Sequence, residues 1–152
     1  MKLIYVILIF IFLPYPSLSK TFLDKISPNL SNLWGVSVLN KKEILFTQRS
    51  GKVFRLNIFN KNIFEVKGVP DVFNSGQGGL LDIVVEKKNE KTKVYLCFSK
   101  KVNKSESATA INSYDFKNDK LKNKKTLFVS NKASSGSRHF GCRLAIKNNY
   151  IY

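Results

Sequence analysis

The chain has 152 residues, 43% of them hydrophobic, which suits one ordinary domain with a core and excludes a disordered tail. Its 26 Lys and Arg against 10 Asp and Glu give a formal net charge of +16, which raises nucleic acid or an anionic membrane surface as possible partners. Most of the excess is lysine beside asparagine, in stretches expected to be solvated turns, without aromatic interleaving, zinc spacing or a basic helix. We therefore expect no nucleic-acid binding.

The first twenty residues, MKLIYVILIFIFLPYPSLSK, have the parts of a secretory leader: Lys2, an apolar run over 3–13, two prolines and small residues before position 20. Cleavage is expected between Ser19 and Lys20, which makes 1–19 a signal peptide and leaves 20–152 as the mature domain. The alternative is an uncleaved membrane anchor, but the apolar run is short of the ~20 residues that span a bilayer. We expect an exported protein, periplasmic or secreted, with no stable membrane insertion after cleavage.

After the leader, short runs rich in β-branched and aromatic residues recur without helical periodicity, which predicts an all-β fold. The runs form two groups of four, separated by polar turns. The first group covers 34–39, 43–48, 52–58 and 62–67, and the second covers 80–85, 93–99, 108–116 and 125–130. A long connection, GVPDVFNSGQGG, joins the groups, and a second long connection leads to the short runs 142–146 and 150–152.

Four short antiparallel strands that repeat every ~40 to 50 residues are typical of a β-propeller blade. A β-sandwich of about eight strands is the alternative. The last run, 150–152, ends without a turn or a polar tail. Because a propeller closes only with ~4 to 8 blades, we expect the chain to supply about two blades and the start of a third, as the N-terminal piece of a longer protein.

The two cysteines, Cys97 and Cys142, are too far apart in sequence for a CxxC redox motif or a paired metal knuckle. Export permits a disulfide between them. Cys97 lies in a predicted strand, however, where a buried cysteine usually acts as a small apolar side chain. We favour the free cysteine.

Each long connection carries one candidate for chemistry. Gly76, Gly78 and Gly79 surround Gln77, and they permit positive φ and close backbone approach, so a tight turn can aim the Gln77 amide at a ligand. The second connection, NKASSGSRHFGCRLAI, contains His139, the one histidine of the sequence. An imidazole can accept a proton near neutral pH or bind a metal, but no Cys, Asp or Glu lies near it at metal-ligand spacing. Residue chemistry alone favours a plain turn and a structural histidine.

The order of the motifs changes this interpretation. LWGVSVLNKKEILFTQRSGKVFRL, GVPDVFNSGQGGLLDIVV and SSGSRHFGCRLAI follow one another, and together they closely resemble the N-terminal third of the soluble quinoprotein aldose sugar dehydrogenases, members of the glucose/sorbosone dehydrogenase family. The resemblance runs from about Leu33 to Tyr152. GQGGLLD and HFGCRLAI are specific together and weak singly.

The resemblance implies a six-bladed β-propeller that binds pyrroloquinoline quinone (PQQ) and calcium and oxidises the C1 hydroxyl of aldoses, passing electrons to an external acceptor. It implies that His139 is the general base and contacts the cofactor, taking the hydroxyl proton while hydride passes to the quinone. It implies that Gln77 contacts both substrate and cofactor. The remaining quinone contacts and the calcium ligands are expected in later blades, so the chain alone is expected to be inactive.

Arg138 departs from the family pattern, which has Asp or Gly before the histidine. A guanidinium there either favours a different substrate, such as an anionic sugar, or points outward into solvent; as a substrate contact it is the third candidate site residue. Trp34, Arg49 and Arg143 also match family positions, and we interpret them as structural. Trp34 is expected to pack between blades, and Arg143 to tie a connection to the neighbouring sheet.

Two other functions remain open. A propeller of the same family without activity would act as a secreted carbohydrate-binding or interaction module, since fold does not determine function. A surface protein that adheres to anionic polymers through its positive charge is the third hypothesis.

Overall fold

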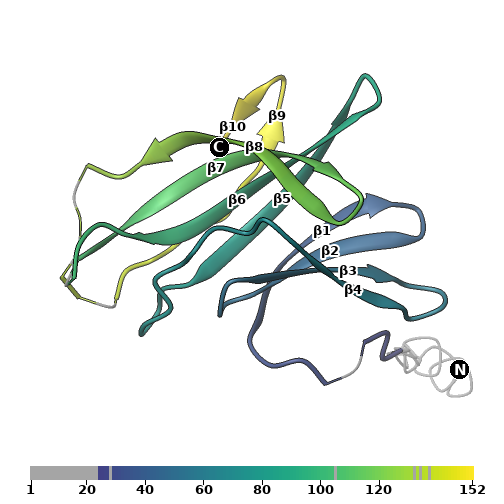
Figure 1. The fold of residues 1–152 in the computed structure, drawn as a ribbon, viewed down its shortest axis with the longest axis horizontal. Coiled ribbons are helices and arrows are strands. Elements are labelled where there is room, and N and C mark those ends of the chain that lie inside the picture. Colours follow the sequence, from purple (N-terminus) through teal and green to yellow (C-terminus); the bar gives the residue numbers. More distant parts are fainter. Residues whose placement is uncertain (1–23, 28, 105, 132, 134, 137) are drawn as a thin grey trace, which may run out of the picture.

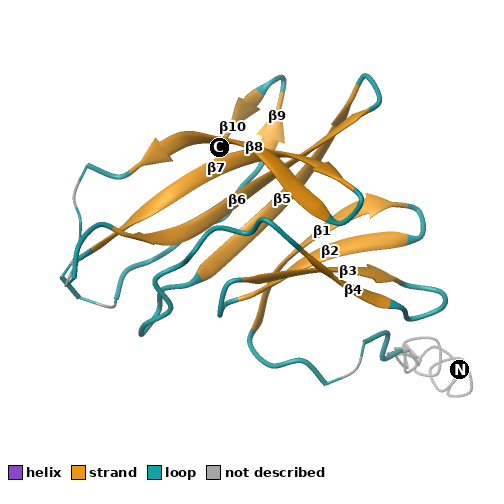
Figure 2. Ribbon diagram, in the orientation of Figure 1, coloured by secondary structure: helices purple, strands orange, loops and turns teal. Residues whose placement is uncertain are grey.

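The computed structural model of the chain describes residues 24–27, 29–104, 106–131, 133, 135–136 and 138–152 (Figure 1). The predicted signal peptide, 1–19, and the first residues of the predicted mature domain, 20–23, lie outside the described residues. The regular structure of the described residues is all β-strand (Figure 2). No helix that could cross a membrane occurs in this part of the chain.

The strands form two four-stranded antiparallel sheets and a short hairpin, each in chain order. The first sheet contains β1 (Leu33–Asn40), β2 (Glu43–Gln48), β3 (Lys52–Asn57) and β4 (Ile63–Val66). The second contains β5 (Leu80–Lys88), β6 (Lys91–Lys101), β7 (Ser107–Lys117) and β8 (Lys120–Val129), and the hairpin is β9 (Ile146–Lys147) with β10 (Tyr150–Ile151). Two successive four-stranded sheets, each with its strands in chain order, have the topology of propeller blades. The prediction of two blades and the start of a third is confirmed.

The hairpins of the second blade are longer than predicted. The stretches KKNEKTK and KNDKLKNKK were expected to be solvated turns, but most of their lysines lie in strands. Only two residues form each turn, Asn89 and Glu90 in one hairpin and Asn118 and Asp119 in the other, all four with φ between 47° and 62°. Two successive positive φ values are the geometry of a type I′ turn, which matches the twist of the flanking strands.

The main core lies between the two blades, where β1 and β2 pack against β5. Residues from both sheets face it, among them Leu45, Val53, Leu80, Ile83 and Leu96, all essentially buried. In β5 a bulge between Leu80 and Asp82 lets both Leu80 and Ile83 reach this core. The innermost strands approach closely because Gly35 of β1 has no side chain; a Cβ there would lie 2.8 Å from Oδ1 of Asp82. The sheets are therefore held as one packed unit.

An ion pair joins the blades at their outer edge. The Arg55 guanidinium of β3 donates to both carboxylate oxygens of Asp119, at 2.5 and 2.7 Å, and also to Glu43. These bonds, that to Asp119 first, raise the pKa of Arg55 above its ordinary value. The pair fixes the β7–β8 turn against the first blade.

The predicted strand 142–146 is wrong in its bounds. Only Ile146 and Lys147 are in a strand, and the chain from Arg138 to Ala145 is irregular. Ala145 and Tyr152 still exchange two backbone hydrogen bonds of 2.9 Å. The segment ahead of the hairpin is held mainly by side chains of the second blade, those of Asp82 and Cys97.

Candidate functional site

Gln77 lies at the exposed tip of the first connection. The backbone N–H of Gly78 donates 2.8 Å to the carbonyl of Ser75, which closes a tight turn with Gln77 inside it. Gly76 adopts φ of 54°, a conformation that glycine reaches without steric cost. The turn therefore directs the Gln77 side chain away from the core, as its glycine-flanked sequence predicted.

The two glycines after Gln77 are required by close approach. A Cβ at Gly78 would lie 2.6 Å from the carbonyl oxygen of Phe73 and 2.8 Å from Oγ of Ser99. A Cβ at Gly79 would lie 2.2 Å from the carbonyl oxygen of Arg49, and the φ of Gly79 is +141°. Any larger residue at either position would displace the turn that carries Gln77.

Arg49 supports this turn from the first blade. Its carbonyl accepts the N–H of Leu80 at 2.9 Å, and its guanidinium donates to the carbonyl of Gly76. Ser99 supports the turn from the second blade, because its buried hydroxyl accepts the N–H of Gly79 at 2.6 Å and donates to the carbonyl of Phe73 at 2.7 Å. The structural interpretation of Arg49 is confirmed.

His139 lies on the second connection and meets Gln77 directly. Its backbone N–H donates 2.7 Å to Oε1 of Gln77. The φ of His139 is 66°, in the left-handed region that a non-glycine residue adopts at a cost and that is found more often at functional sites. The two residues that the sequence singled out are thus neighbours, joined through the backbone of His139 and the side chain of Gln77.

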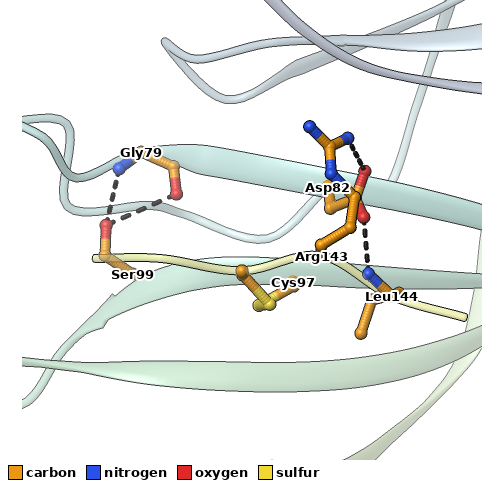
Figure 3. Close-up of a disulfide and its surroundings, with 7 residues drawn as sticks. Gly79, Asp82, Cys97, Ser99, Arg143 and Leu144 are labelled. Carbon is orange, nitrogen blue, oxygen red and sulfur yellow. Dashed lines mark hydrogen bonds and ion pairs between the residues drawn. A yellow bond between two sulfur atoms is a disulfide. The ribbon is translucent and has the colours of Figure 1, made fainter. Parts of the chain in front are cut away.

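The segment after His139 is fixed by the carboxylate of Asp82 in β5, which is almost fully buried. One oxygen accepts the backbone N–H of Leu144 at 2.7 Å, and the other accepts from Arg143 at 3.2 Å (Figure 3). The predicted role of Arg143 as a tie to the neighbouring sheet is confirmed. Since the Arg143 side chain is 74% exposed, the bond to Leu144 is the stronger of the two restraints.

A disulfide between Cys97 of β6 and Cys142 holds the same segment (Figure 3). The prediction that the cysteines are free is therefore wrong. Their Cα atoms lie 6.3 Å apart although 45 residues separate them in sequence. The second connection returns across the face of β6 that points away from the first blade, and this return places Cys142 over Cys97.

A small hydrophobic cluster lies around the disulfide, formed by Tyr95, Cys97 and Leu144 with partly buried neighbours such as Ile146 and Ile151. Tyr95 donates 2.7 Å from its hydroxyl to Glu86. Burial, with a smaller contribution from this bond, raises the pKa of Tyr95 to about 12. The cluster provides an apolar support for the segment that follows His139.

Two other predicted residues contribute no contact in this region. Arg138 is exposed beside His139, and it makes no hydrogen bond or ion pair with the described residues. Trp34 lies on the face of the first blade turned away from the second, where it is 49% exposed beside Ile26, Ile44 and Phe46. The described residues do not place Trp34 between two blades.

The donors at this edge suit a polar, negatively charged quinone such as PQQ. Gln77 uses Oε1 for His139, and its Nε2 donor has no partner in the described part of the chain. The imidazole of His139 and the guanidinium of Arg138 are exposed, and neither forms a hydrogen bond or ion pair with another described residue. No cluster of three or more His, Cys, Asp or Glu side chains occurs among the described residues, so no calcium site is assigned to them.

Sequence reasoning missed the residues that hold the site. Ser99, Asp82 and the disulfide all act on segments far along the chain, and no local pattern marks them. The acidic residue in GQGGLLD was a weak signal, because a carboxylate in an otherwise apolar strand requires a partner when buried.

Comparison with known proteins supports the resemblance drawn from the motifs. Residues 30–152 match the family model described as Glucose / Sorbosone dehydrogenase. No curated protein matches the chain.

Several solved structures share the fold. A glucose dehydrogenase is 30% identical with a TM-score of 0.68, over 78% of this chain and 38% of that one. The soluble aldose sugar dehydrogenase of Escherichia coli, in its apo-form, is 27% identical with a TM-score of 0.68, over 76% of this chain and 34% of that one. The PQQ-bound aldose sugar dehydrogenase of Streptomyces coelicolor, 24% identical with a TM-score of 0.58 over 72% of this chain and 34% of that one, shows likeness of fold alone. The chain spans about a third of the length of these proteins.

Proposed function

The chain belongs to the glucose/sorbosone dehydrogenase family, and from this premise we propose that its gene product oxidises aldose sugars at C1 in a PQQ-dependent reaction. The observation that carries the proposal is the hydrogen bond from the His139 backbone to the Gln77 side chain. It brings together the two residues that the family motifs mark, from connections far apart in the sequence. The bond uses only the backbone of His139, so the exposed imidazole stays available to a substrate.

In the proposed reaction His139 acts as the general base. A ring nitrogen of the exposed imidazole accepts the proton of the C1 hydroxyl, and an imidazole suits this step because it titrates near neutral pH. The chemistry that PQQ supplies when bound is acceptance of the hydride from C1. The bond from the His139 backbone to Gln77 engages neither ring nitrogen, so the unprotonated one can accept the proton.

Gln77 and Arg138 serve as binding residues in the proposal. The Nε2 group of Gln77 donates to an oxygen of the sugar or of the quinone while Oε1 holds the His139 backbone. Arg138, exposed next to the base, contacts the substrate and favours sugars that carry a negative charge. The exposed position of the turn supports the first role, and charge alone supports the second.

The named relatives support the substrate and cofactor. One solved relative is an aldose sugar dehydrogenase, and another of the same fold is a PQQ-bound aldose sugar dehydrogenase. Because the chain spans about a third of such proteins, we propose that calcium and the other quinone contacts belong to later blades and that these 152 residues alone are inactive. The predicted leader, 1–19, supports a reaction in the periplasm or outside the cell, with an external electron acceptor.

Substitution of His139 tests the proposal. The complete gene product, loaded with PQQ and calcium, is assayed for dye reduction with a panel of neutral and acidic aldoses. His139→Asn keeps a residue that tolerates the left-handed conformation, and loss of a general base should lower kcat about 10²- to 10⁴-fold. Asn149→Ala is the matched control, because Asn149 is also exposed with φ of 66° but lies in the β9–β10 turn.

Activity near wild type in His139→Asn would overturn the assignment of the base. Sugar binding by the wild-type protein without any dye reduction would instead support the non-catalytic carbohydrate-binding module. A preference for acidic over neutral aldoses that disappears in Arg138→Ala would support the role of Arg138, and an unchanged preference would contradict it.

A further inference from the structure

Strand β6 holds both connections of the candidate site through two residues of one face. Cys97 and Ser99 are two positions apart in the strand, so their side chains point to the same side of the sheet. Both are completely buried. Cys97 bonds to Cys142 of the second connection, and Ser99 bonds to Gly79 of the first (Figure 3).

Ser99 closes the base of the loop that carries Gln77. Its backbone N–H donates to the carbonyl of Gly79 at 2.9 Å, and its carbonyl accepts the N–H of Phe73 at 2.8 Å. The Ser99 hydroxyl bonds to the same two residues: it accepts from the N–H of Gly79 at 2.6 Å and donates to the carbonyl of Phe73 at 2.7 Å. Both ends of the loop, one on each side of Gln77, are therefore tied to a single residue.

Cys97 provides the corresponding restraint for His139. Cys142 follows His139 by three residues, in a part of the chain that has no regular strand. The disulfide is the one covalent link between this irregular segment and a strand within the described residues. The distance that His139 can move from β6 is limited by this short tether.

We propose that Cys97 and Ser99 are positioning residues that fix the place of His139 relative to Gln77. Their importance for turnover rests on the function proposed above, whereas their effect on the geometry of the two connections does not. β6 is well suited to the role, because it is hydrogen-bonded along its length to β5 on one side and β7 on the other. A rigid support matters because a displacement of a reacting group by about 1 Å can lower the reaction rate ~10²-fold.

Amide hydrogen exchange at His139 tests the geometry without any activity measurement. Its N–H is protected by Oε1 of Gln77, and it reports whether the two connections stay together. Ser99→Ala removes the buried hydroxyl that orders the Gln77 loop, so His139 exchange should rise about tenfold, as expected when a buried hydrogen-bonding group is lost.

Thr47→Val is the matched control. The Thr47 hydroxyl is also fully buried in a central strand and accepts a glycine N–H, that of Gly35, at 2.9 Å. Thr47 lies in β2 and Gly35 in β1, so neither residue belongs to either connection. His139 exchange in Thr47→Val should stay within about twofold of wild type.

The disulfide gives a second, independent measurement. In the intact chain treated with a phosphine reductant, and in the double variant Cys97→Ala with Cys142→Ala, the His139 N–H should exchange at least about tenfold faster. Reoxidation of the reduced wild-type chain should restore protection, and the double variant should not respond to either treatment. The restored signal distinguishes a positioning role from irreversible damage to the fold.

The kinetic test uses the complete gene product. Ser99→Ala should lower kcat about tenfold while KM changes less than twofold, and Thr47→Val should change neither beyond twofold. Equal His139 exchange in Ser99→Ala, Thr47→Val and wild type would overturn the positioning proposal, even if His139→Asn is inactive. A normal rate in His139→Asn would overturn the proposed function, yet it would leave the exchange result standing.

Discussion

The backbone N–H of His139 lies 2.7 Å from Oε1 of Gln77, 62 residues earlier in the chain. The two long connections meet through this bond. It holds the Gln77 amide by Oε1 and leaves Nε2 unbonded to the His139 backbone. A left-handed His139, with φ of 66°, presents its N–H to the glutamine. The acceptor of this bond can be changed without changing its donor.

Gln77→Glu and Gln77→Ala should separate the two functions of the glutamine. Glutamate keeps an acceptor oxygen for the His139 N–H, whereas alanine removes it. His139 amide exchange should rise about fivefold or more in Gln77→Ala and stay within twofold in Gln77→Glu, because one hydrogen bond contributes about 1 kcal/mol. Dye reduction by the complete gene product should fall in both, since both lack the Nε2 donor. Equal exchange in the two variants would contradict the prediction.

Gly79→Ala should destabilise the fold strongly. Its Cβ would lie 2.2 Å from the carbonyl oxygen of Arg49, and φ of +141° disfavours any other residue. We expect a loss of at least about 2 kcal/mol in the free energy of unfolding, measured with urea. Gly141→Ala is the control, because a Cβ there meets nothing within 4 Å. Its stability should change by less than about 0.5 kcal/mol, and equal losses would contradict the role of Gly79.

Asp82→Ala should cost more stability than Arg143→Ala. Removal of the buried carboxylate leaves the Leu144 N–H without its acceptor, a loss of about 2–3 kcal/mol in the free energy of unfolding. Removal of the exposed guanidinium should cost less than about 1 kcal/mol. Urea unfolding at pH 7 measures both, and a larger loss in Arg143→Ala would show that the ion pair is the main restraint.

Loss of the disulfide should lower the free energy of unfolding by about 3–4 kcal/mol, the magnitude expected for a closed loop of this length. Thermal unfolding of the wild-type chain with and without reductant measures the effect. The variant with both Cys97 and Cys142 changed to Ala should resemble the reduced wild type and should not respond to reductant. A wild-type Tm that is insensitive to complete reduction would contradict the prediction.

Tyr95 should make stability fall at high pH. Its pKa is raised by burial to about 12 in the folded chain, above the ordinary value of 10.0. Below pH 10 the contribution of Tyr95 to the free energy of unfolding is fully present. Between pH 10 and 12 its hydroxyl is ionised in the unfolded chain but still protonated in the folded chain. The free energy of unfolding therefore falls over this range, by roughly 2–3 kcal/mol in all.

Urea unfolding at a series of pH values from 9 to 12 measures this loss. Tyr95→Phe has no hydroxyl to titrate, so its stability should fall less steeply over this range than that of the wild type. Tyr150→Phe removes an exposed tyrosine and should keep the wild-type slope. Identical slopes in the wild type and Tyr95→Phe would show that burial of this hydroxyl does not couple to folding.

Much of the fold could be predicted from the sequence because its determinants are local. Runs of β-branched and aromatic residues between polar turns mark the strands, and the runs were found in their correct order. Their lengths were underestimated in the second blade, where lysines at strand ends resemble turn sequence. Only φ values above zero at pairs such as Asn118 and Asp119 show where the chain actually turns.

The candidate site was predicted in part. Gly76, Gly78 and Gly79 indicate a tight turn in any context, and the motif order led to Gln77 and His139. The roles of Gln77, His139 and Arg138 stay predictions. The cysteine pairing was wrong because the sequence shows that Cys97 lies in a strand, but it does not show what passes over that strand.

The sequence by itself determined the all-β class, the division into two groups of four strands and the glycine turn around Gln77, since each follows from residues close together in the chain. Only the tertiary structure decided that Ser99 closes the Gln77 loop, that Asp82 holds Leu144 and that Cys97 meets Cys142. These contacts join residues 20, 62 and 45 positions apart. The last two exist because the second connection folds back over the second blade, and the first exists because the Gln77 loop returns to β6. Both paths are set by the packing of whole sheets.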